Sequence, residues 1–351
     1  MKSVNLKRLA EELNLSVATV SRALNDRYDI SQPTKDRVRE LANKLNYEPN
    51  PYASGLRNQK SRTIGVVIPE VANHFFSLAI NGIEEVARAN DYHVLIYLTH
   101  EDYEREVSVA RLLAGGRVEG VMISVASGSR DYAHLDSLQE RGIPLVFFDR
   151  VHEELATAKV TTNDYESSYQ ATRHLLDNGC RAIAHLTLSE SLSIGKRRLQ
   201  GYVDALKAAG IPYDEELVVH ALANKAQDIQ TIQELLLKRP DIDGFFASIE
   251  SLAMYTYEAC RNLGLVIPTD IKVIGFSNLE MASLLDPPLT TITQPAYAIG
   301  KEAATILFRA ITKNALITAT QSLELKSELI VRGSTRASVD MVAAKAHQQR
   351  S

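Results

Sequence analysis

With 351 residues, the chain is too long for one ordinary domain, and its 45% hydrophobic and 23% charged residues are typical of a globular protein. No apolar run reaches membrane-spanning length, Met1 is followed by a charged helical pattern rather than a signal segment, and the two cysteines lack metal-ligand spacing. We therefore expect a cytoplasmic protein with no membrane contact, no metal site and no cofactor.

Charge is distributed unevenly along the chain. Residues 1–62 contain twelve Lys and Arg against seven Asp and Glu, a net charge of +5. Residues 63–351 contain the other 27 basic and 36 acidic residues, a net charge of −9. This asymmetry is typical of a small nucleic-acid-binding head on an acidic body, although solvated helices also carry such charges.

The head is predicted to contain three short helices. Apolar residues recur at helical spacing over 6–13, and Asn14 follows at a position that tolerates a left-handed turn. Ser16 is suited to cap a second helix, and a third amphipathic helix runs over about 34–45. This arrangement predicts a helix-turn-helix; a plain three-helix bundle is the alternative.

The second helix presents small groups that allow close approach to base edges, and an arginine suited to guanine. These residues are Ser16, Val17, Ala18, Thr19, Ser21 and Arg22.

A short proline-containing stretch follows the head. Pro49 and Pro51 should stop the third helix near Tyr47, and Asn50 is suited to cap a new helix. Because that helix is short and contains Gly55, it should not be stable alone. Our hypothesis is that it orders only when both its ends are held.

From Thr63 onward, short apolar runs alternate with helical patterns. Strands are predicted at 63–69, 92–98, 118–124 and 144–148 and, in a second series that begins near Asp164, at 182–187, 217–220, 244–247 and 272–276. Such alternation predicts parallel sheets covered on both faces. The two series predict two lobes that face one cleft.

Ligands of open α/β sheets bind at the carboxyl ends of the strands. The polar and aromatic residues at these positions are Asn73, Phe75, Phe76, Ser124, Asp149, Arg150, Arg197, Arg198, Ser277 and Asn278. Aromatic, carboxylate and guanidinium groups that converge on a cleft indicate recognition of a sugar or a nucleobase. For any one of these residues alone, a surface or salt-bridge role is equally plausible.

The head and the following stretch resemble those of LacI/GalR-family repressors. The matching residues are Leu15–Asn25, Ser31, Thr34, Leu45–Asn50, Ala53 and Leu56. The resemblance implies that Val17, Ala18 and Arg22 face bases in the major groove, while Ser16, Thr19, Ser21 and Asn25 contact phosphates or fix the helix. The head departs from many members at Leu13-Asn14, where Ala-Gly is usual.

The resemblance also implies a hinge helix that contains Asn50, Ala53 and Leu56. Leu56 corresponds to the leucine that wedges into the minor groove at the centre of a palindromic operator. Two heads on one palindrome imply a homodimer.

The body is similar to periplasmic sugar-binding proteins. Residues 198–202 match the Arg-x-x-Gly-aromatic motif whose arginine anchors the effector, Asp149 matches a carboxylate after the fourth strand, and Phe75 matches a stacking position. Residues 288–295 resemble the crossover between lobes and 330–334 the final strand. The implied effector site comprises Phe75, Ser124, Asp149, Arg198, Ile249 and Ser277.

Two departures affect the implied sugar site. Ile249-Glu250 stands where the family usually has Asn-Asp, and Ser277 stands where it has Asp. Because both lost groups normally bond ligand hydroxyls, a standard hexose pose would lack acceptors. A less hydroxylated, phosphorylated or otherwise different ligand, or loss of effector binding, would account for these residues.

The predicted fold class is an N-terminal all-α helix-turn-helix head with a hinge helix, followed by an α/β two-lobed effector domain of the type I periplasmic-binding-protein kind. We assign residues 1–47 to the head, 48–61 to the hinge and 62–336 to the body. Lobe one takes about 62–160 and 293–320, and lobe two about 161–292 and 321–336. The tail, 337–351, is expected to be disordered, and it lacks the leucine heptads of a tetramerising coiled coil.

The predicted function is that of a sequence-specific transcriptional repressor whose affinity for double-stranded operator DNA is switched by a small molecule, a sugar or a sugar derivative. A solute-binding protein is the first alternative, but the basic head and the missing signal segment disfavour it. An enzyme is the second, but no catalytic motif is visible, so no catalytic residue is assigned.

Overall fold

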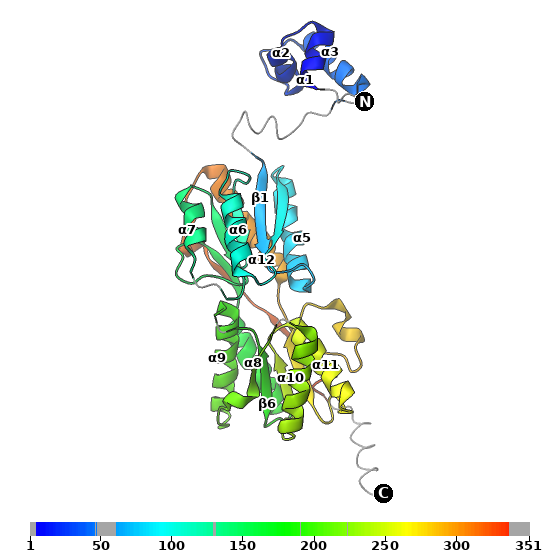
Figure 1. Cartoon of the computed structure of the whole chain (residues 1–351), viewed down its shortest axis with the longest axis vertical. Helices are drawn as coiled ribbons and strands as arrows, with labels where there is room; N and C mark the ends of the chain where they lie inside the picture. The colour runs from blue at the N-terminus through cyan, green and yellow to red at the C-terminus, as the bar shows by residue number, and fades with distance from the viewer. Residues whose placement is uncertain are drawn as a thin grey trace. The chain divides into compact units, whose positions relative to one another are not determined.

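The structure, a computed structural model, describes residues 5–45, 47, 61–128, 131–189, 191–222 and 224–336. The chain divides between Ser61 and Arg62 into two compact units (Figure 1). The hinge residues Asn50, Ala53 and Leu56 and the tail over 337–351 lie outside the described residues.

The first unit contains three helices, α1 (Leu6–Leu13), α2 (Val17–Leu24) and α3 (Gln32–Lys44). Asn14 adopts the left-handed conformation at φ 56°, and its backbone N–H donates to the Ala10 and Glu11 carbonyls. The Ser16 side chain accepts from the Thr19 backbone N–H and so caps α2. The predicted helix-turn-helix is therefore confirmed.

The three helices enclose a small core made of Leu9, Ala10, Val20, Ala23, Val38 and Ala42. Helix α3 begins two residues before the predicted start, because Ser31 occupies the N-cap and Pro33 lies in the first turn, where its fixed φ suits a helix.

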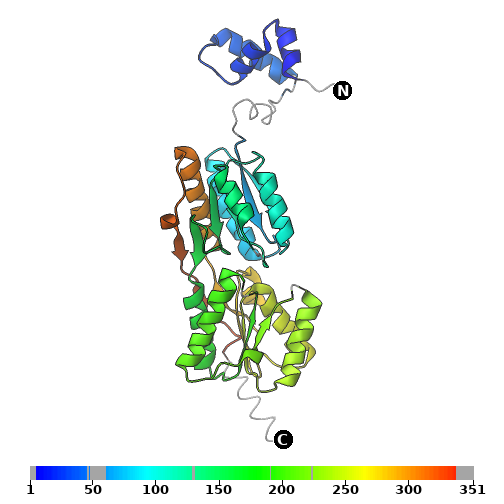
Figure 2. The ribbon, with the colours of Figure 1, turned by 60° about the vertical axis from the view of Figure 1, so that its left-hand side comes forward.

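The second unit contains two six-stranded sheets, each flanked by helices (Figure 2). The first sheet is parallel, in the order β11 (Leu323–Leu325), β5 (Lys159–Thr162), β4 (Leu145–Phe148), β3 (Val121–Ile123), β1 (Thr63–Ile68), β2 (His93–Leu98). The second has the order β12 (Glu328–Ile330), β10 (Thr290–Thr293), β9 (Lys272–Phe276), β8 (Gly244–Ala247), β6 (Ile183–Thr187), β7 (Val218–His220), and only β12 is antiparallel. The predicted two-lobed α/β architecture is confirmed.

Eight α-helices are described in this unit. Lobe one carries α5 (His74–Ala89), α6 (Tyr103–Leu113), α7 (Ala133–Glu140) and α12 (Ala296–Lys313). Lobe two carries α8 (Asp164–Asp177), α9 (Ser193–Ala208), α10 (Lys225–Lys238) and α11 (Glu250–Asn262). Three short 3₁₀ turns lie at Glu215–Leu217, Glu280–Leu284 and Ala319–Gln321. No helix among the described residues is long and apolar enough to span a bilayer.

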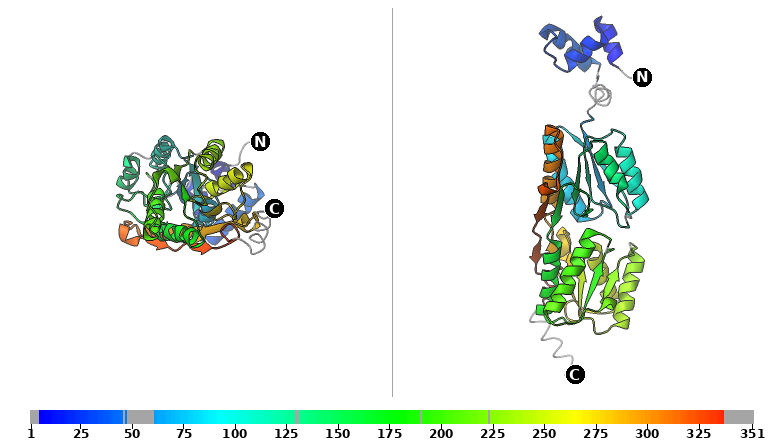
Figure 3. Two further views of the ribbon diagram at one scale, coloured as in Figure 1. Left: turned by 90° about the horizontal axis from the view of Figure 1, so that it is seen from below. Right: turned by 90° about the vertical axis from the view of Figure 1, so that its left-hand side faces the viewer.

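The chain passes between the lobes three times, and the last passage lies later than predicted. We assigned residues 321–336 to lobe two, but β11 pairs with β5 and completes the edge of the first sheet. Figure 3 shows α12 and the segment after it, orange to red, along one side of both lobes. The short, exposed Leu-Glu-Leu pattern of β11 gave no sign of which sheet it joins.

The predicted final strand at 330–334 is also displaced. The observed strand β12 ends at Ile330, where the chain leaves the ladder. Beyond it, the Arg332 Nη1 donates to the Leu289 carbonyl, and the Ser334 Oγ donates to the Val273 carbonyl. These side-chain bonds, together with backbone bonds from the Ser334 N–H to the Pro288 carbonyl and from the Val273 N–H to the Ser334 carbonyl, hold the segment without a regular ladder.

Two pairs of helices pack with their backbones in near contact. In lobe one, a Cβ at Gly82 of α5 would collide with the Tyr297 carbonyl of α12. In lobe two, a Cβ at Gly201 of α9 would collide with the Tyr165 carbonyl of α8. The glycine of the Arg-x-x-Gly-aromatic motif thus permits close approach of α8 and α9.

Replacing Gly201 with Ala should lower the free energy of unfolding by about 1–3 kcal/mol, because the added methyl group forces α8 and α9 apart. Urea denaturation of the purified chain measures this loss. Gln200→Ala, on the exposed side of the same helix, is the control and should change the value by less than about 0.5 kcal/mol. Equal effects of both substitutions would show that the close approach is not required.

Candidate functional site

The exposed face of α2 holds most of the residues predicted to read DNA. Val17 is 43% exposed, and Ser16, Ala18 and Arg22 are exposed as well. Thr19 and Ser21 are half-buried. Because Val20 and Ala23 of the same helix lie in the core, this face is free to enter a groove.

Two of the predicted polar residues also hold the ends of α2. The Ser16 Oγ lies 2.8 Å from the Thr19 Oγ1, and the Asn25 Nδ2 donates to the Ser21 carbonyl at 2.8 Å. Arg22 forms an ion pair in which its Nη1 lies 2.9 Å from the Asp29 Oδ2. Sequence reasoning did not identify Asp29, because nothing in the pattern links it to Arg22.

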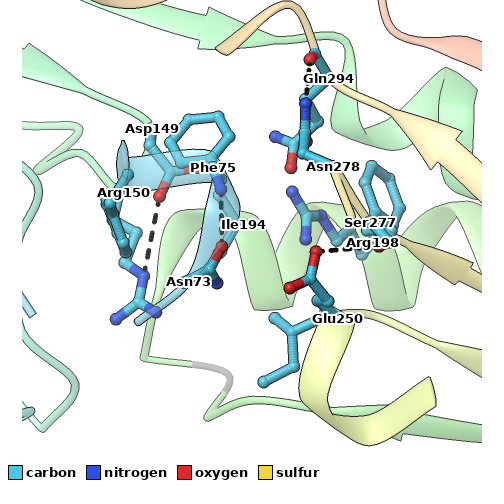
Figure 4. Close-up of a pocket in the computed structure, with 13 residues that line it drawn as sticks. Asn73, Phe75, Asp149, Arg150, Ile194, Arg198, Glu250, Ser277, Asn278 and Gln294 are labelled. Carbon is cyan, nitrogen blue, oxygen red and sulfur yellow. Dashed lines mark hydrogen bonds and ion pairs between the residues drawn. The ribbon is translucent and has the colours of Figure 1, made fainter. Parts of the chain in front are cut away.

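The second candidate site is a cleft between the two lobes (Figure 4). Its lining residues follow the carboxyl ends of strands in both sheets or begin the next helices. They are Asn73, Phe75, Phe76, Asp149 and Arg150 from lobe one and Ile194, Arg198, Ile249, Glu250, Phe276, Ser277, Asn278 and Gln294 from lobe two and the crossover.

Five of the six residues predicted to bind an effector line this cleft: Phe75, Asp149, Arg198, Ile249 and Ser277. Ser124 does not line it; it is buried, and its Oγ donates to the Asp149 Oδ2 at 3.3 Å. Arg197, another candidate, instead contacts the carboxylates of Glu153 and Glu324.

Arg198 is held rigidly at the lobe-two side of the cleft and is only 2% exposed. Its Nε donates to the Asp164 Oδ1 at 2.8 Å, its Nη1 donates to the Ser248 carbonyl, and its guanidinium carbon lies 3.7 Å from the centre of the Phe276 ring. The Nη2 lies 2.6 Å from the same Asp164 oxygen without hydrogen-bond geometry. The Arg198 charge is therefore neutralised by Asp164 within the wall of the cleft.

Asp149 lies across the cleft in a strained backbone conformation, with φ at 61°. It is 7% exposed, and burial raises the pKa of its carboxyl group to about 6, although Arg150 and Arg198 oppose this shift. The neighbouring Arg150 donates from Nη1 to both Glu101 oxygens, at 2.6 and 2.9 Å.

Glu250 joins the two lobes. Its Oε1 lies 2.8 Å from the Nδ1 of His74, at the start of α5, and its Oε2 accepts from the Ser277 Oγ at 2.9 Å. The sequence led us to expect that Glu250 and Ser277 would leave the cleft without acceptors. The longer glutamate side chain instead brings a carboxylate into the cleft, while Ile249 adds apolar surface.

Negative charge predominates around the cleft. Both lining guanidinium groups already face carboxylates of the chain, those of Glu101 and Asp164. Asp149 and Glu250 add two further carboxylates to the lining. Burial raises the pKa of nearby Glu70, and the charges of Glu101 and Glu250 raise it further.

The sequence analysis missed four residues at the cleft: Ile194, Phe276, Gln294 and, opposite Glu250, His74. Ile194 gave no signal because an apolar residue in the first turn of a helix is ordinary. Gln294 lies in the crossover, where its Nε2 donates to the Thr162 Oγ1 and its carbonyl accepts from the Asn278 Nδ2. His74 could be recognised only once Glu250 was placed opposite it. Among the described residues, no group of three or more His, Cys, Asp or Glu is arranged to hold a metal ion.

The raised pKa of Asp149 predicts a pH-dependent effect of Asp149→Asn. A neutral Asp149 carboxyl is favoured in the fold, so its contribution to stability is present at low pH and is lost as pH rises through about 6. Above that pH, Asp149→Asn should raise the free energy of unfolding, by at most about 3 kcal/mol, and near pH 4 it should change little.

Urea denaturation across this pH range measures the difference. Asp177→Asn, which removes an exposed partner of Arg173, is the control and should have a small effect at every pH. A pH-independent effect of Asp149→Asn would contradict the prediction.

Comparison with known families divides the chain as the structure does. The pattern of bacterial regulatory proteins of the lacI family matches residues 5–50. The pattern of periplasmic binding proteins and the sugar-binding domain of the LacI family matches residues 61–329.

Similar proteins extend over most of the chain. The HTH-type transcriptional repressor CytR of Escherichia coli (strain K12) is 30% identical over 336 residues, which are 95% of this chain and 97% of CytR. Catabolite control protein A of Priestia megaterium is 28% identical over 313 residues, which are 89% of this chain and 93% of that protein.

Solved structures show the same fold. The transcriptional regulator CelR in complex with cellobiose is 28% identical, with a TM-score of 0.71 over 95% of this chain and 100% of CelR. The lac repressor dimer bound to operator is 24% identical, with a TM-score of 0.81 over 96% of this chain and 100% of that chain.

Proposed function

This chain belongs to the LacI family of bacterial regulatory proteins. We propose that it is a repressor whose affinity for a palindromic operator is switched by a neutral carbohydrate bound between its lobes. As a member of that family, it is a DNA-binding transcriptional regulator. The family consists of regulators, and we propose no enzymatic activity for this chain.

One observation carries the switching part of the proposal: the polar groups of the cleft come from both lobes. Asp149 lies in lobe one, Arg198 lies in lobe two, and the His74–Glu250 contact joins the two. A ligand that bonds groups from both lobes must therefore favour one relative orientation of the lobes over another. A useful switch needs about 1–3 kcal/mol of coupling between ligand and operator.

We propose that a homodimer places two heads on the operator, with Val17, Ala18 and Arg22 at base edges and the residues at the ends of α2 near phosphates. Two-fold symmetry of a dimer matches the symmetry of a palindrome. The hinge residues Asn50, Ala53 and Leu56 would enter the minor groove of the bent duplex.

The lining of the cleft supports a ligand that has both an apolar face and hydroxyl groups. Phe75, Phe76 and Phe276 offer ring surfaces, while Asp149 and Glu250 accept hydrogen bonds. The body matches a sugar-binding domain, and one similar regulator has been solved with cellobiose. A phosphorylated or carboxylated ligand is disfavoured, because both lining arginines already face carboxylates.

We expect neutral sugars to bind in preference to their phosphate esters. Calorimetric titration with a panel of neutral mono- and disaccharides should identify a ligand, and its phosphate ester should bind at least about tenfold more weakly because of like-charge repulsion. Glu250→Gln should reduce this discrimination, whereas Asp177→Asn, remote from the lining, should leave it unchanged. Tighter binding of the phosphate ester would contradict the assignment.

The DNA-binding role is tested by selecting genomic fragments with the purified full-length chain and sequencing those that are retained. We expect a palindrome to be enriched. Arg22→Ala should then reduce affinity for that palindrome about tenfold or more relative to random DNA, because a bidentate guanine contact is lost. Arg8→Ala, which removes the same charge from α1, should affect both kinds of DNA alike.

Equal losses on palindromic and random DNA for Arg22→Ala would contradict the base-reading role. Retention of a sugar with no enrichment of any fragment, with or without that sugar, would instead favour a solute-binding protein.

A further inference from the structure

The DNA-reading face contains an ion pair between Arg22 and Asp29. Arg22 lies in the last turn of α2, and Asp29 lies in the loop between α2 and α3. The Arg22 Nη1 donates to the Asp29 Oδ2 at 2.9 Å, and the two side chains are 55% and 39% exposed.

The loop does not depend on this pair for its conformation. Asp26, at φ 54°, fixes the loop: its Oδ1 lies 3.1 Å from the Lys35 Nζ and 3.0 Å from the Arg39 Nη2. Its carbonyl accepts a further bond from Lys35, and the Ile30 N–H donates to the Arg27 carbonyl. The end of α2 is closed by backbone bonds from Asp26 and Arg27 to the Ala23 and Arg22 carbonyls.

As a source of stability, an exposed pair of this kind contributes little. A carboxylate beside a DNA-reading arginine also repels phosphates, which weakens every contact with the backbone of the duplex. The main effect of the ion pair is therefore on Arg22, because the bond to Asp29 restricts the orientation of the guanidinium group.

We propose that Asp29 is a specificity-determining residue that positions Arg22. By occupying Nη1, it holds the guanidinium in one orientation and leaves the Nε and Nη2 donors as a fork for the O6 and N7 of a guanine. It also restrains Arg22 from turning towards a phosphate, the contact that any sequence offers. The inference rests on the base-reading role proposed for Arg22.

Orienting Arg22 towards a base and restraining it from phosphates both favour the operator over random DNA. Pre-orientation lowers the entropy lost when Arg22 bonds a guanine, so the operator complex gains. Restraint from phosphates weakens complexes with random DNA, whereas repulsion weakens all complexes alike and leaves the ratio of affinities unchanged. The ratio of the two affinities rises, although affinity for DNA as a whole does not.

The test compares the full-length chain with Asp29→Asn, Arg22→Ala and the double variant. Asparagine keeps the size of the side chain and removes its charge. A duplex pool with a randomised central segment is first enriched with the unaltered chain. Fluorescence anisotropy then measures the affinity of each variant for the most enriched duplex and for a scrambled duplex of the same composition.

Asp29→Asn should lower the ratio of enriched to scrambled affinity by roughly twofold to fivefold, mainly through tighter binding of the scrambled duplex. In the Arg22→Ala background the same substitution should leave the ratio unchanged, because there is no guanidinium to position. Asp36→Asn removes an equal charge from α3, where Asp36 accepts from Gln32. This control should affect both duplexes alike.

The three variants distinguish a failure of the Asp29 role from a failure of base reading by Arg22. If Arg22→Ala lowers the ratio but Asp29→Asn behaves as Asp36→Asn does, the role of Asp29 is overturned and the proposed function stands. If Asp29→Asn lowers the ratio equally with and without Arg22, its effect does not act through Arg22 and the positioning role is overturned. If Arg22→Ala leaves the ratio unchanged, or no duplex is enriched, the proposed reading of DNA fails and the inference fails with it.

Discussion

The buried Arg198 guanidinium is the interaction on which the cleft depends. A cation removed from water must be paired and hydrogen-bonded, and Arg198 satisfies this requirement with groups from three places in the chain. Asp164 begins α8 directly after the first crossover, the Ser248 carbonyl follows β8, and Phe276 ends β9. The same contacts that satisfy the charge therefore bring the ends of three elements together behind the Arg198 side of the cleft.

Much of this arrangement could be predicted from the sequence, because the underlying signals are local. Alternating apolar runs and helical patterns identified both sheets, and the rule that parallel strands present a site at their carboxyl ends located Asp149 and Arg198. Asn14 kept its turn because a short polar side chain tolerates the left-handed conformation.

The remaining features depend on contacts between residues distant in sequence. Neither the joining of β11 to the first sheet nor the approach of His74 to Glu250 has a local signal. Ser124 carries the expected chemistry but lies behind Asp149 rather than in the cleft. His185 is buried between the rings of Tyr202 and Phe246, and burial lowers its pKa to about 3.

The close contact between α5 and α12 has a mechanical consequence. Both helices start near the cleft, α5 just after Asn73 and α12 just after Gln294. Their backbones are in close contact at Gly82 and Gly300, so we expect the two helices to move together. At the opposite end of α5, the Asp91 carboxylate lies 3.7 Å from the Arg62 guanidinium, and the His93 N–H donates to the Arg62 carbonyl. Helix α5, whose 16 residues span about 24 Å, thus connects the cleft at its first turn with Arg62, the residue at which the body begins, at its far end.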